Sequence, residues 1–377
     1  MRVSTWLIIA LSASTAFGQA TLGPKADELA KARKSGVNFL KTTQNEDGSW
    51  TAPKAAGITC LVTYSLVKSG LKQDDPVLKR AYKHILANVK KDGGIYVDKS
   101  NHRNYETCLA VLALSVVNKD GRYKKQIEGA EKFLRGLQWD EGEGLSSTDA
   151  AYGGAGYGSH ERPDMSNTQF FVEALRAAGA KEDDPDIQKA LKFISRGQNL
   201  ESEHNTLPYA GKINDGGFYY TPAAGGETKS EVTENGGLRS YGSMTYAGLK
   251  SMIYAGLNSE DKRVKAAFKW IQKNYSVDQN PGVGLQGLFY YYHTFAKALS
   301  VLEIDYVVEA DGTKNDWRKD VANKLIEIQY ENGSWLNKTP RWYEGDPNLV
   351  TAYSLLALSY CEPKTIKPGS KAKKSAE

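Results

Sequence analysis

Several side chains that can do chemistry stand at or just before a threonine that recurs along the chain. They comprise two carboxylates, an imidazole, a guanidinium, an amide and several phenols: Glu106, Asp164, His293, Arg103, Asn167, Tyr241, Tyr290, Tyr291 and Tyr292. Carboxylates and imidazoles serve as general acids and bases, and aromatic faces stabilise cations. If the fold brings these residues together, they form a cavity for a polar or amphipathic ligand. Glu106, Asp164 and His293 are then the candidate catalytic groups, and the others are candidate ligand-binding residues.

Each of these residues also has a structural interpretation. Acidic residues at the start of a helix cap it or stabilise its first turn. A single histidine such as His293 can cap a helix or lie buried with its hydrogen bonds satisfied. Three consecutive tyrosines are also typical of helix packing. The sequence leaves both interpretations open.

The elements that must position these residues appear in the stretch Asp164-Met165-Ser166-Asn167-Thr168. Ser166 and Gln169, three residues apart, have the form of a capping box at the start of a helix. The residues that follow are mostly apolar, which predicts a largely buried helix. Leu175 lies seven residues after Thr168, so both side chains face one side of that helix.

The same Thr-to-apolar spacing occurs six times. The six threonines are Thr59, Thr107, Thr168, Thr245, Thr294 and Thr351. A recurrence at this scale indicates a repeat architecture, which must be recognised before the chain is divided into domains. We therefore interpret residues 21–363 as one repeat domain with six inner helices.

A second helix precedes each inner one. Its end is clearest in Gln44-Asn-Glu-Asp-Gly48-Ser-Trp50 and in Gln329-Tyr-Glu-Asn-Gly333-Ser-Trp335. Glycine after a helix suits a left-handed backbone conformation, and the following aromatic residue can fold back as an apolar plug. The first and last copies carry the best pattern, whereas an open solenoid needs atypical end repeats. We therefore predict an all-α fold, a closed (α/α)6 toroid of six helical hairpins.

The inner helices of such a ring run parallel, so their N-termini meet at one mouth. Free N–H groups and positive dipole ends there favour anionic or polar ligand groups. The glycine-rich stretch 149–164 is predicted to form a loop over this mouth. It lacks the GxxxxGK[ST] phosphate loop, so its glycines serve tight turns.

At this point the chain resembles the terpenoid cyclase and protein prenyltransferase superfamily of α/α toroids. The repeats are similar to the prenyltransferase/squalene-oxidase repeat, and the Gln…Gly-x-Trp patterns resemble the QW motifs of squalene-hopene cyclases. The resemblance covers about residues 36 to 361. It implies the toroid fold and a hydrophobic or amphipathic small-molecule ligand in the central cavity.

The resemblance also allows a test of the family's chemistry. Class II cyclases carry Asp-x-Asp-Asp-Thr at the start of one inner helix, and the middle Asp is the general acid. At the matching positions this chain keeps Asp164 and Thr168 but has Ser166 and Asn167, which are not acids strong enough for that role. The cyclase acid motif is therefore degenerate, and whether the chain is an enzyme is uncertain.

The zinc site of the prenyltransferases is not predicted either. Tyr292-His293-Thr294 resembles the segment that carries their zinc-binding His, but Met244 and Tyr246 stand where an Asp and a Cys would match. One histidine does not hold zinc. We expect no metal and no cofactor.

The two ends of the chain differ in composition from the repeat domain between them. Residues 1–20 begin with Arg2, continue with a short apolar stretch and finish in small residues near Ala20, which is typical of a signal peptide. We expect a secreted or periplasmic protein without a transmembrane span in the mature chain. Residues 364–377 are polar and basic, and are predicted to be a disordered tail.

Net charge and cysteine count exclude two further classes. The chain has a formal charge of +5, but the two ends account for all of it and the body is formally neutral. Nucleic-acid binding, which needs a basic face on the folded body, is therefore not expected. Cys60, Cys108 and Cys361 are too few for a disulfide scaffold, and we expect them to be small buried residues.

Three hypotheses about function remain after these exclusions. The first is a ligand-binding protein without the parent cyclase chemistry. The second is an enzyme that uses Asp164, Glu106 and His293 on an isoprenoid or a glycan, which requires that the three side chains converge in one pocket. The third is an interaction scaffold, which requires a filled barrel and an exposed apolar patch elsewhere.

Overall fold

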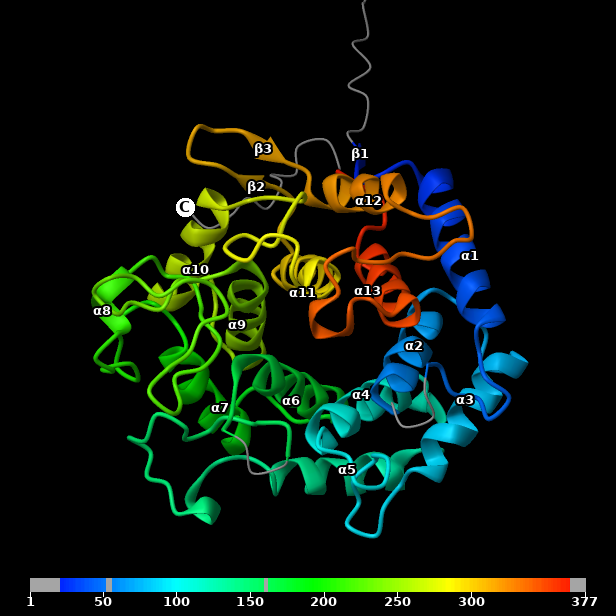
Figure 1. The fold of residues 1–377 in the computed structure, drawn as a ribbon, viewed down its shortest axis with the longest axis horizontal. Coiled ribbons are helices and arrows are strands. Elements are labelled where there is room, and N and C mark those ends of the chain that lie inside the picture. Colours follow the sequence, from blue (N-terminus) through cyan, green and yellow to red (C-terminus); the bar gives the residue numbers. More distant parts are fainter. Residues whose placement is uncertain (1–20, 52–55, 159–161, 367–377) are drawn as a thin grey trace, which may run out of the picture.

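The computed structural model describes residues 21–51, 56–158 and 162–366. Six helices form a closed inner ring in which each helix packs against two neighbours and the last packs against the first (Figure 1). In ring order they are α2 (Ala56–Lys68), α4 (Arg103–Ser115), α6 (Met165–Ala178), α9 (Gly242–Tyr254), α11 (Leu288–Val301) and α13 (Pro347–Ser359). The predicted all-α toroid is confirmed.

Six outer helices surround this ring. They are α1 (Ala26–Thr42), α3 (Pro76–Ala87), α5 (Lys124–Arg135), α7 (Pro185–Arg196), α10 (Lys262–Lys273) and α12 (Trp317–Glu327). The described residues also form a short helix α8 (Ala210–Ile213), three 3-10 turns (Asn118–Asp120, Glu141–Glu143 and Arg341–Tyr343) and four two-residue strands. Strands β2 (Val307–Val308) and β3 (Lys314–Asn315) make a hairpin.

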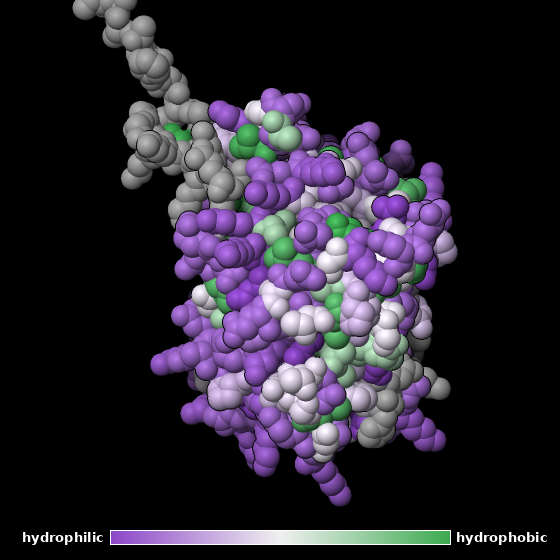
Figure 2. Space-filling model, turned by 90° about the vertical axis from the view of Figure 1, so that its left-hand side faces the viewer, coloured by the Kyte–Doolittle hydropathy of each residue, from purple (hydrophilic) through white to green (hydrophobic). Residues whose placement is uncertain are grey.

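The division into inner and outer helices follows from their apolar patterns. In α13 every residue from Asn348 to Leu358 is buried, as expected for a helix that is surrounded on all sides. In α5 only Ile127, Ala130 and Leu134 are buried, a single stripe at helical spacing. Figure 2 shows the result on one outer face, which is mostly hydrophilic and carries only small apolar patches.

The repeated threonine has a structural task. In five of the six copies its hydroxyl oxygen accepts a hydrogen bond from a backbone N–H in the turn that precedes the inner helix. The donors are Trp50, Ile95, Ala155, Phe218 and Trp335, at 3.0–3.1 Å from Thr59, Thr107, Thr168, Thr245 and Thr351. The sixth, Thr294, instead donates to carbonyls of its own helix. The threonine thus ties the turn to the inner helix.

The repeated Gln and Gly join neighbouring outer helices. Gln44 Nε2 donates to the carbonyl of Val77 in α3 at 2.9 Å, and Gln329 Nε2 donates to that of Ala32 in α1 at 3.0 Å. Gly333 has a φ of +87°, and a Cβ there would lie 2.3 Å from the Ser35 carbonyl oxygen of α1. The last repeat therefore packs directly against the first, as the predicted closure of the ring requires.

The two ends of the body also meet. Strand β1 (Thr21–Leu22) pairs with β4 (Lys364–Thr365) in antiparallel register, Thr21 opposite Thr365. The prediction that the tail begins at Lys364 is wrong to this extent, because residues 364–365 form a strand. The predicted signal peptide and the rest of the tail lie outside the described residues.

Two local predictions have clear outcomes. Helix α6 is capped by Asp164, whose carboxylate accepts the Asn167 N–H at 2.9 Å. The predicted capping box with Ser166 as its cap is therefore wrong, because the cap is Asp164 and the helix begins two residues earlier. Cys60, Cys108 and Cys361 are free and buried, as expected.

Candidate functional site

A cavity of about 400 Å³ lies at the mouth formed by the N-termini of the inner helices. All six inner helices contribute to its wall. The lining residues are Gly57, Ile58, His102, Tyr105, Glu106, Tyr157, Ser166, Asn167, Phe170, Tyr220, Lys229, Tyr241, Ser243, Met244, Gly287, Tyr290, Trp342, Tyr343, Glu344, Leu349 and Tyr353. Its volume falls at the lower end of the roughly 300–1,000 Å³ that small-molecule sites occupy.

Aromatic side chains dominate the wall, with seven tyrosines, one phenylalanine and one tryptophan. Four of these rings, here called the aromatic floor, contact one another in the order Tyr105, Phe170, Tyr290 and Tyr353. The Tyr105 and Tyr353 hydroxyls share a hydrogen bond of 3.0 Å. Burial raises the pKa of both phenols, so they stay neutral. This wall offers ring faces and hydroxyls, which suits a ligand with both apolar and polar parts.

Glu106 is the one predicted catalytic candidate whose side chain lines the cavity. Its carboxylate accepts hydrogen bonds from the Val97 N–H at 2.9 Å and from the Ser100 hydroxyl at 2.7 Å. Burial raises the pKa of Glu106, and these two hydrogen bonds oppose the rise. The carboxylate therefore anchors the loop before α4 and still borders the ligand space.

Asp164 lies behind the cavity wall. It is fully buried, and both of its oxygens are engaged by Asn167, through the backbone N–H at 2.9 Å and through Nδ2 at 2.8 Å. Burial raises the pKa of Asp164, against these hydrogen bonds. Asp164 therefore serves as a helix cap and orients Asn167, whose side chain lines the cavity.

His293 lies one turn below the cavity. Its ring stacks on Tyr353 of the aromatic floor, with centroids 5.8 Å apart. Burial, and then the charge of Lys250, lower the pKa of His293 to about 3, so the ring is neutral. The second hypothesis required Glu106, Asp164 and His293 to share one pocket. The structure does not bring the three side chains together.

The predicted ligand-binding residues divide into two groups. Asn167, Tyr241 and Tyr290 line the cavity. Arg103, Tyr291 and Tyr292 lie elsewhere: Arg103 donates to the Gly158 carbonyl, and the two phenols donate to the carbonyls of Ser276 and Val277 at 2.7 and 2.6 Å. In three consecutive helical residues only one side chain can face the barrel axis, and here it is Tyr290.

The predicted loop 149–164 does border the mouth, where its Tyr157 lines the cavity. Sequence reasoning missed the two other loops that supply part of the wall. Lys229 lines the cavity, pairs with Glu227 and lies 4.3 Å from the centre of the Tyr220 ring. Arg162 pairs with the same carboxylate. Burial is the main cause that lowers the pKa of Lys229. The outer end of the cavity thus carries a basic group next to aromatic faces.

A second loop contributes Trp342, Tyr343 and Glu344. Trp342 and Tyr343 have φ values of +56° and +63°, a conformation that is costly for residues with a Cβ. Glu344 holds the loop in place, because its carboxylate accepts the Tyr290 N–H at 2.8 Å and the Asn337 amide at 2.6 Å. Burial raises the pKa of Glu344 to about 7. The strained pair is thus fixed over the mouth by an anchor at the start of α11.

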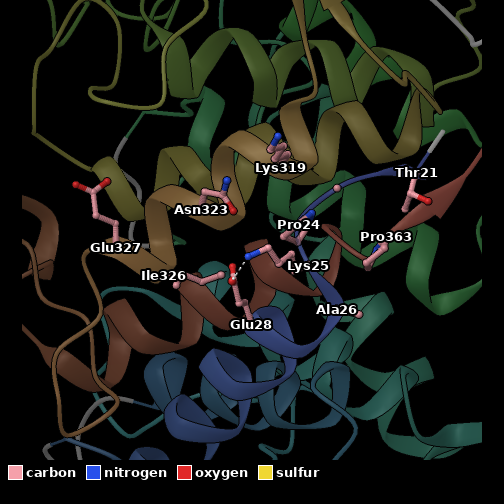
Figure 3. Close-up of a pocket in the computed structure, with 11 residues that line it drawn as sticks. Thr21, Pro24, Lys25, Ala26, Glu28, Lys319, Asn323, Ile326, Glu327 and Pro363 are labelled. Carbon is pink, nitrogen blue, oxygen red and sulfur yellow. Dashed lines mark hydrogen bonds and ion pairs between the residues drawn. The ribbon is translucent and has the colours of Figure 1, made fainter.

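A second hollow, of about 630 Å³, lies on the outside between residues 21–28 and α12 (Figure 3). Its ionic groups are Lys25, Glu28, Lys319 and Glu327, and Lys25 and Glu28 pair with each other at 2.8 Å. Both side chains of that pair are largely exposed. This hollow lacks the buried polar groups and aromatic faces of the central cavity, which makes it the weaker candidate site.

The described residues contain no group of three or more His, Cys, Asp or Glu arranged to hold a metal ion. Within the same ranges, no helix combines the length and the apolar character that crossing a bilayer requires.

Comparisons with known proteins agree with this fold. The family model of the squalene-hopene cyclase C-terminal domain matches residues 51–221. The type II terpene cyclase MstE from Scytonema superposes with a TM-score of 0.54 at 12% identity, covering 90% of this chain and 98% of that one. Candida albicans protein geranylgeranyltransferase-I, complexed with GGPP, gives 0.51 at 13% identity, covering 87% and 90%.

No curated protein matches the chain. The structural likenesses are too distant in sequence to show more than the fold. Together with the family model, they confirm the resemblance to the α/α-toroid superfamily of terpenoid cyclases and protein prenyltransferases.

Proposed function

We propose that this squalene-cyclase-like toroid binds an amphipathic small molecule of isoprenoid type in its central cavity, without the acid-initiated cyclisation of the class II cyclases. The observation that carries the proposal is the cavity wall itself. Ile58, Phe170, Met244 and Leu349 and the faces of the aromatic rings provide apolar surface, while Lys229, His102 and the hydroxyls provide polar groups. The solved relative complexed with GGPP supports the ligand class by analogy.

The non-catalytic part of the proposal rests on the start of α6. The sequence resemblance places Ser166 at the position of the family's general acid. Asp164, the remaining carboxyl group of the motif, is buried as a helix cap. A general acid must reach the substrate within hydrogen-bond distance. Asp164 does not line the cavity, so protonation of a bound double bond has no evident donor at this position.

The other two hypotheses receive less support. The enzyme hypothesis required Glu106, Asp164 and His293 in one pocket, and only Glu106 lines the cavity. The scaffold hypothesis required a filled barrel. The mouth of this barrel is hollow, with a cavity of about 400 Å³.

The first test is binding and turnover with the mature chain. Geranylgeraniol and squalene are titrated against the protein while the fluorescence of Trp342 and the other tryptophans is followed, and extracts are analysed for cyclic products. We expect saturable binding and no product. A cyclic product that disappears in Asp164→Asn would overturn the non-catalytic part.

A pair of substitutions identifies the site of binding. Ile58 borders the cavity and is partly exposed to it, so Ile58→Trp fills ligand space without disturbing the core. We expect at least a tenfold loss of affinity, about 1.4 kcal/mol. Ile326→Trp fills the second hollow instead and should leave affinity unchanged. If the effects of the two substitutions are reversed, the ligand does not bind in the central cavity.

We also propose that the protein is exported, as the character of residues 1–20 suggests. Strand β1 of the folded body begins at Thr21, directly after the proposed cleavage site. Expression in a secreting host, followed by mass analysis of the exported chain, should find an N-terminus near Thr21. Retention of the full-length chain inside the cell contradicts this proposal.

A further inference from the structure

Three ionic side chains meet inside the barrel below the aromatic floor. Lys250 Nζ lies 2.6 Å from Glu173 Oε2, and Lys297 Nζ bonds Glu173 Oε1. The three residues lie eight or nine positions beyond the starts of α6, α9 and α11. At 1.5 Å per residue they form one layer about 12–14 Å below the mouth. Side-chain exposures of 0%, 5% and 3% for Lys250, Lys297 and Glu173 make this a buried layer.

The charges in this layer do not balance. Two ammonium groups share one carboxylate, which leaves one positive charge in excess when all three are ionised. Burying an uncompensated charge is costly. Burial is the main cause that lowers the pKa of Lys297, and the positive charge of Lys68 on α2 lowers it further. The weak negative potential at a helix C-terminus fades within the last turn. Lys250 and Lys297 each lie four residues before the last residue of their helix.

The hydrogen-bonding groups of this layer are also unbalanced, because its donors outnumber its acceptors. An ammonium group has three donors. Within the described chain Lys250 reaches two acceptors, Gln169 Oε1 and Glu173, while Lys297 reaches Glu173 and the face of Tyr64, 5.8 Å from the ring centroid. Gln169 Nε2 and His293 Nδ1, both buried, have no hydrogen-bond partner there. The unused ammonium protons and the Gln169 amide N–H leave the layer with more donors than acceptors, and His293 Nδ1 adds a further donor in the tautomer that carries its proton there.

We propose that the Lys250–Glu173–Lys297 layer, with Gln169 and His293, binds one small monovalent anion, a halide or a small carboxylate. Such an anion supplies the missing negative charge and accepts the unused donors. The proposal concerns the layer below the floor and is independent of the ligand in the mouth cavity. Since each of α6, α9 and α11 supplies part of the site, the bound anion ties three neighbouring inner helices together.

Protonation sets the pH range of this binding. Burial lowers the pKa of Lys250 and of Lys297 to about 7. The other titratable groups that bear on the layer are Glu173, His293, Lys68 and the phenols of Tyr64, Tyr254 and Tyr360. The phenols stay neutral below pH 9, and His293 is neutral above pH 4. Both lysines are charged below pH 7, so the anion should bind more tightly at pH 6 than at pH 9.

The experiment measures thermal stability against anion concentration. The protein is dialysed to equilibrium in sodium gluconate, and chloride, bromide, nitrate or formate then replaces gluconate at constant ionic strength. We expect Tm to rise saturably at pH 6 and much less at pH 9. If Tm rises with the halides but not with formate, the site binds a halide. If it rises with formate but not with the halides, the site binds a small carboxylate.

Variants separate site binding from a general salt effect. Lys297→Met leaves Lys250 and Glu173 as a balanced pair, so it should fold and lose the anion-dependent rise in Tm. Lys265→Met, at the exposed pair with Glu260, should keep the full rise. An equal rise in Lys297→Met and in the unmodified protein overturns the proposal.

A second measurement needs no variant. Crystals soaked in bromide should show an anomalous peak within hydrogen-bond distance of Nζ of Lys250 and Lys297. No peak there, together with a Tm that does not respond to anions at pH 6, also overturns the proposal. The layer would then balance its charge by keeping one lysine deprotonated.

Discussion

The recurring threonine shows how much one hydroxyl contributes in this fold. In copy four, Thr245 accepts the Phe218 N–H at 3.1 Å and donates to the Tyr241 carbonyl at 3.0 Å. In copy five, Thr294 only donates within its own helix. The two residues are equally buried, so they form a matched pair for measuring the link between turn and helix.

We expect Thr245→Val to lower the free energy of unfolding by about 1–3 kcal/mol more than Thr294→Val does, because only the first leaves a buried N–H without an acceptor. Valine keeps the shape of threonine, so packing changes little. Urea unfolding of the two variants measures the difference. Equal losses would mean that the hydroxyl matters only within its own helix.

Single residues were the least predictable part of the site. Asn167, Tyr241, Tyr290 and Glu106 were found because they stand next to the repeated threonine, where helical periodicity places them at the mouth. Asp164 was found for the same reason, but its carboxyl group turns back to cap its helix. The signal for the buried layer, a lysine or glutamate inside an otherwise apolar inner helix, was present in the sequence at Glu173, Lys250 and Lys297.

At the scale of elements, the closest approaches are between a turn and the next outer helix. A Cβ on Gly48, Gly93, Gly153, Gly216 or Gly333 would lie 1.9–2.5 Å from a carbonyl oxygen of that helix. Along the ring, the junction from α10 to α12 differs, because strand β2 packs on α10 there and Gln272 donates to the Val308 carbonyl. Five junctions between neighbouring outer helices thus share the same glycine contact. At the sixth, the β2–β3 hairpin makes the contact with the outer helix instead.

Gly333→Ala tests the junction that closes the ring. Its φ of +87° and the contact with Ser35 both oppose a side chain. Gly312 has a φ of +88°, but a Cβ there would meet nothing within 4 Å, so it shares only the first cost. We expect both alanine variants to lose about 1–2 kcal/mol for the left-handed backbone, and Gly333→Ala to lose about 1–3 kcal/mol more for the clash. Equal losses in thermal unfolding would show that the junction yields easily.

Elements differ in how far the sequence predicts them. The inner helices and the Gln…Gly-Ser-Trp turns followed from periodicity, which depends on local chemistry. The loops that carry Tyr157, Tyr220, Lys229 and Trp342 have no such period, and tertiary contacts fix their positions. Glu344, for example, is placed by the N–H groups at the start of α11, 54 or more residues away in sequence.

At the scale of the whole molecule, closure of the ring means that every repeat packs against a neighbour on both sides. Helix α13 packs against both α2 and α1, and α12 packs against α1. Closure was predicted from the likeness of the first and last turns. The pairing of β1 with β4 was not, since two-residue strands carry no periodic signal.

A circular permutant tests this closure. Thr21 and Thr365 are paired across two antiparallel strands, so their backbones lie about 5 Å apart and a short linker can join them. New ends are opened between Asp311 and Gly312, at the exposed tip of the β2–β3 hairpin. We expect this permutant to fold with a Tm within a few degrees of the parent. A permutant opened inside α9, between Ala247 and Gly248, should not fold, and equal behaviour of the two would contradict the ring as the unit of stability.

The β1–β4 pair also sets how the molecule can be attached to something else. It follows α13 and precedes α1, so it lies at the end of the ring where the inner helices finish, opposite the mouth. A surface, a tag or a fused domain joined through either end of the body would therefore hold the toroid with its cavity facing outward. Attached to a sensor chip through a tag that directly follows Thr365, the protein should present its cavity to a ligand flowing past.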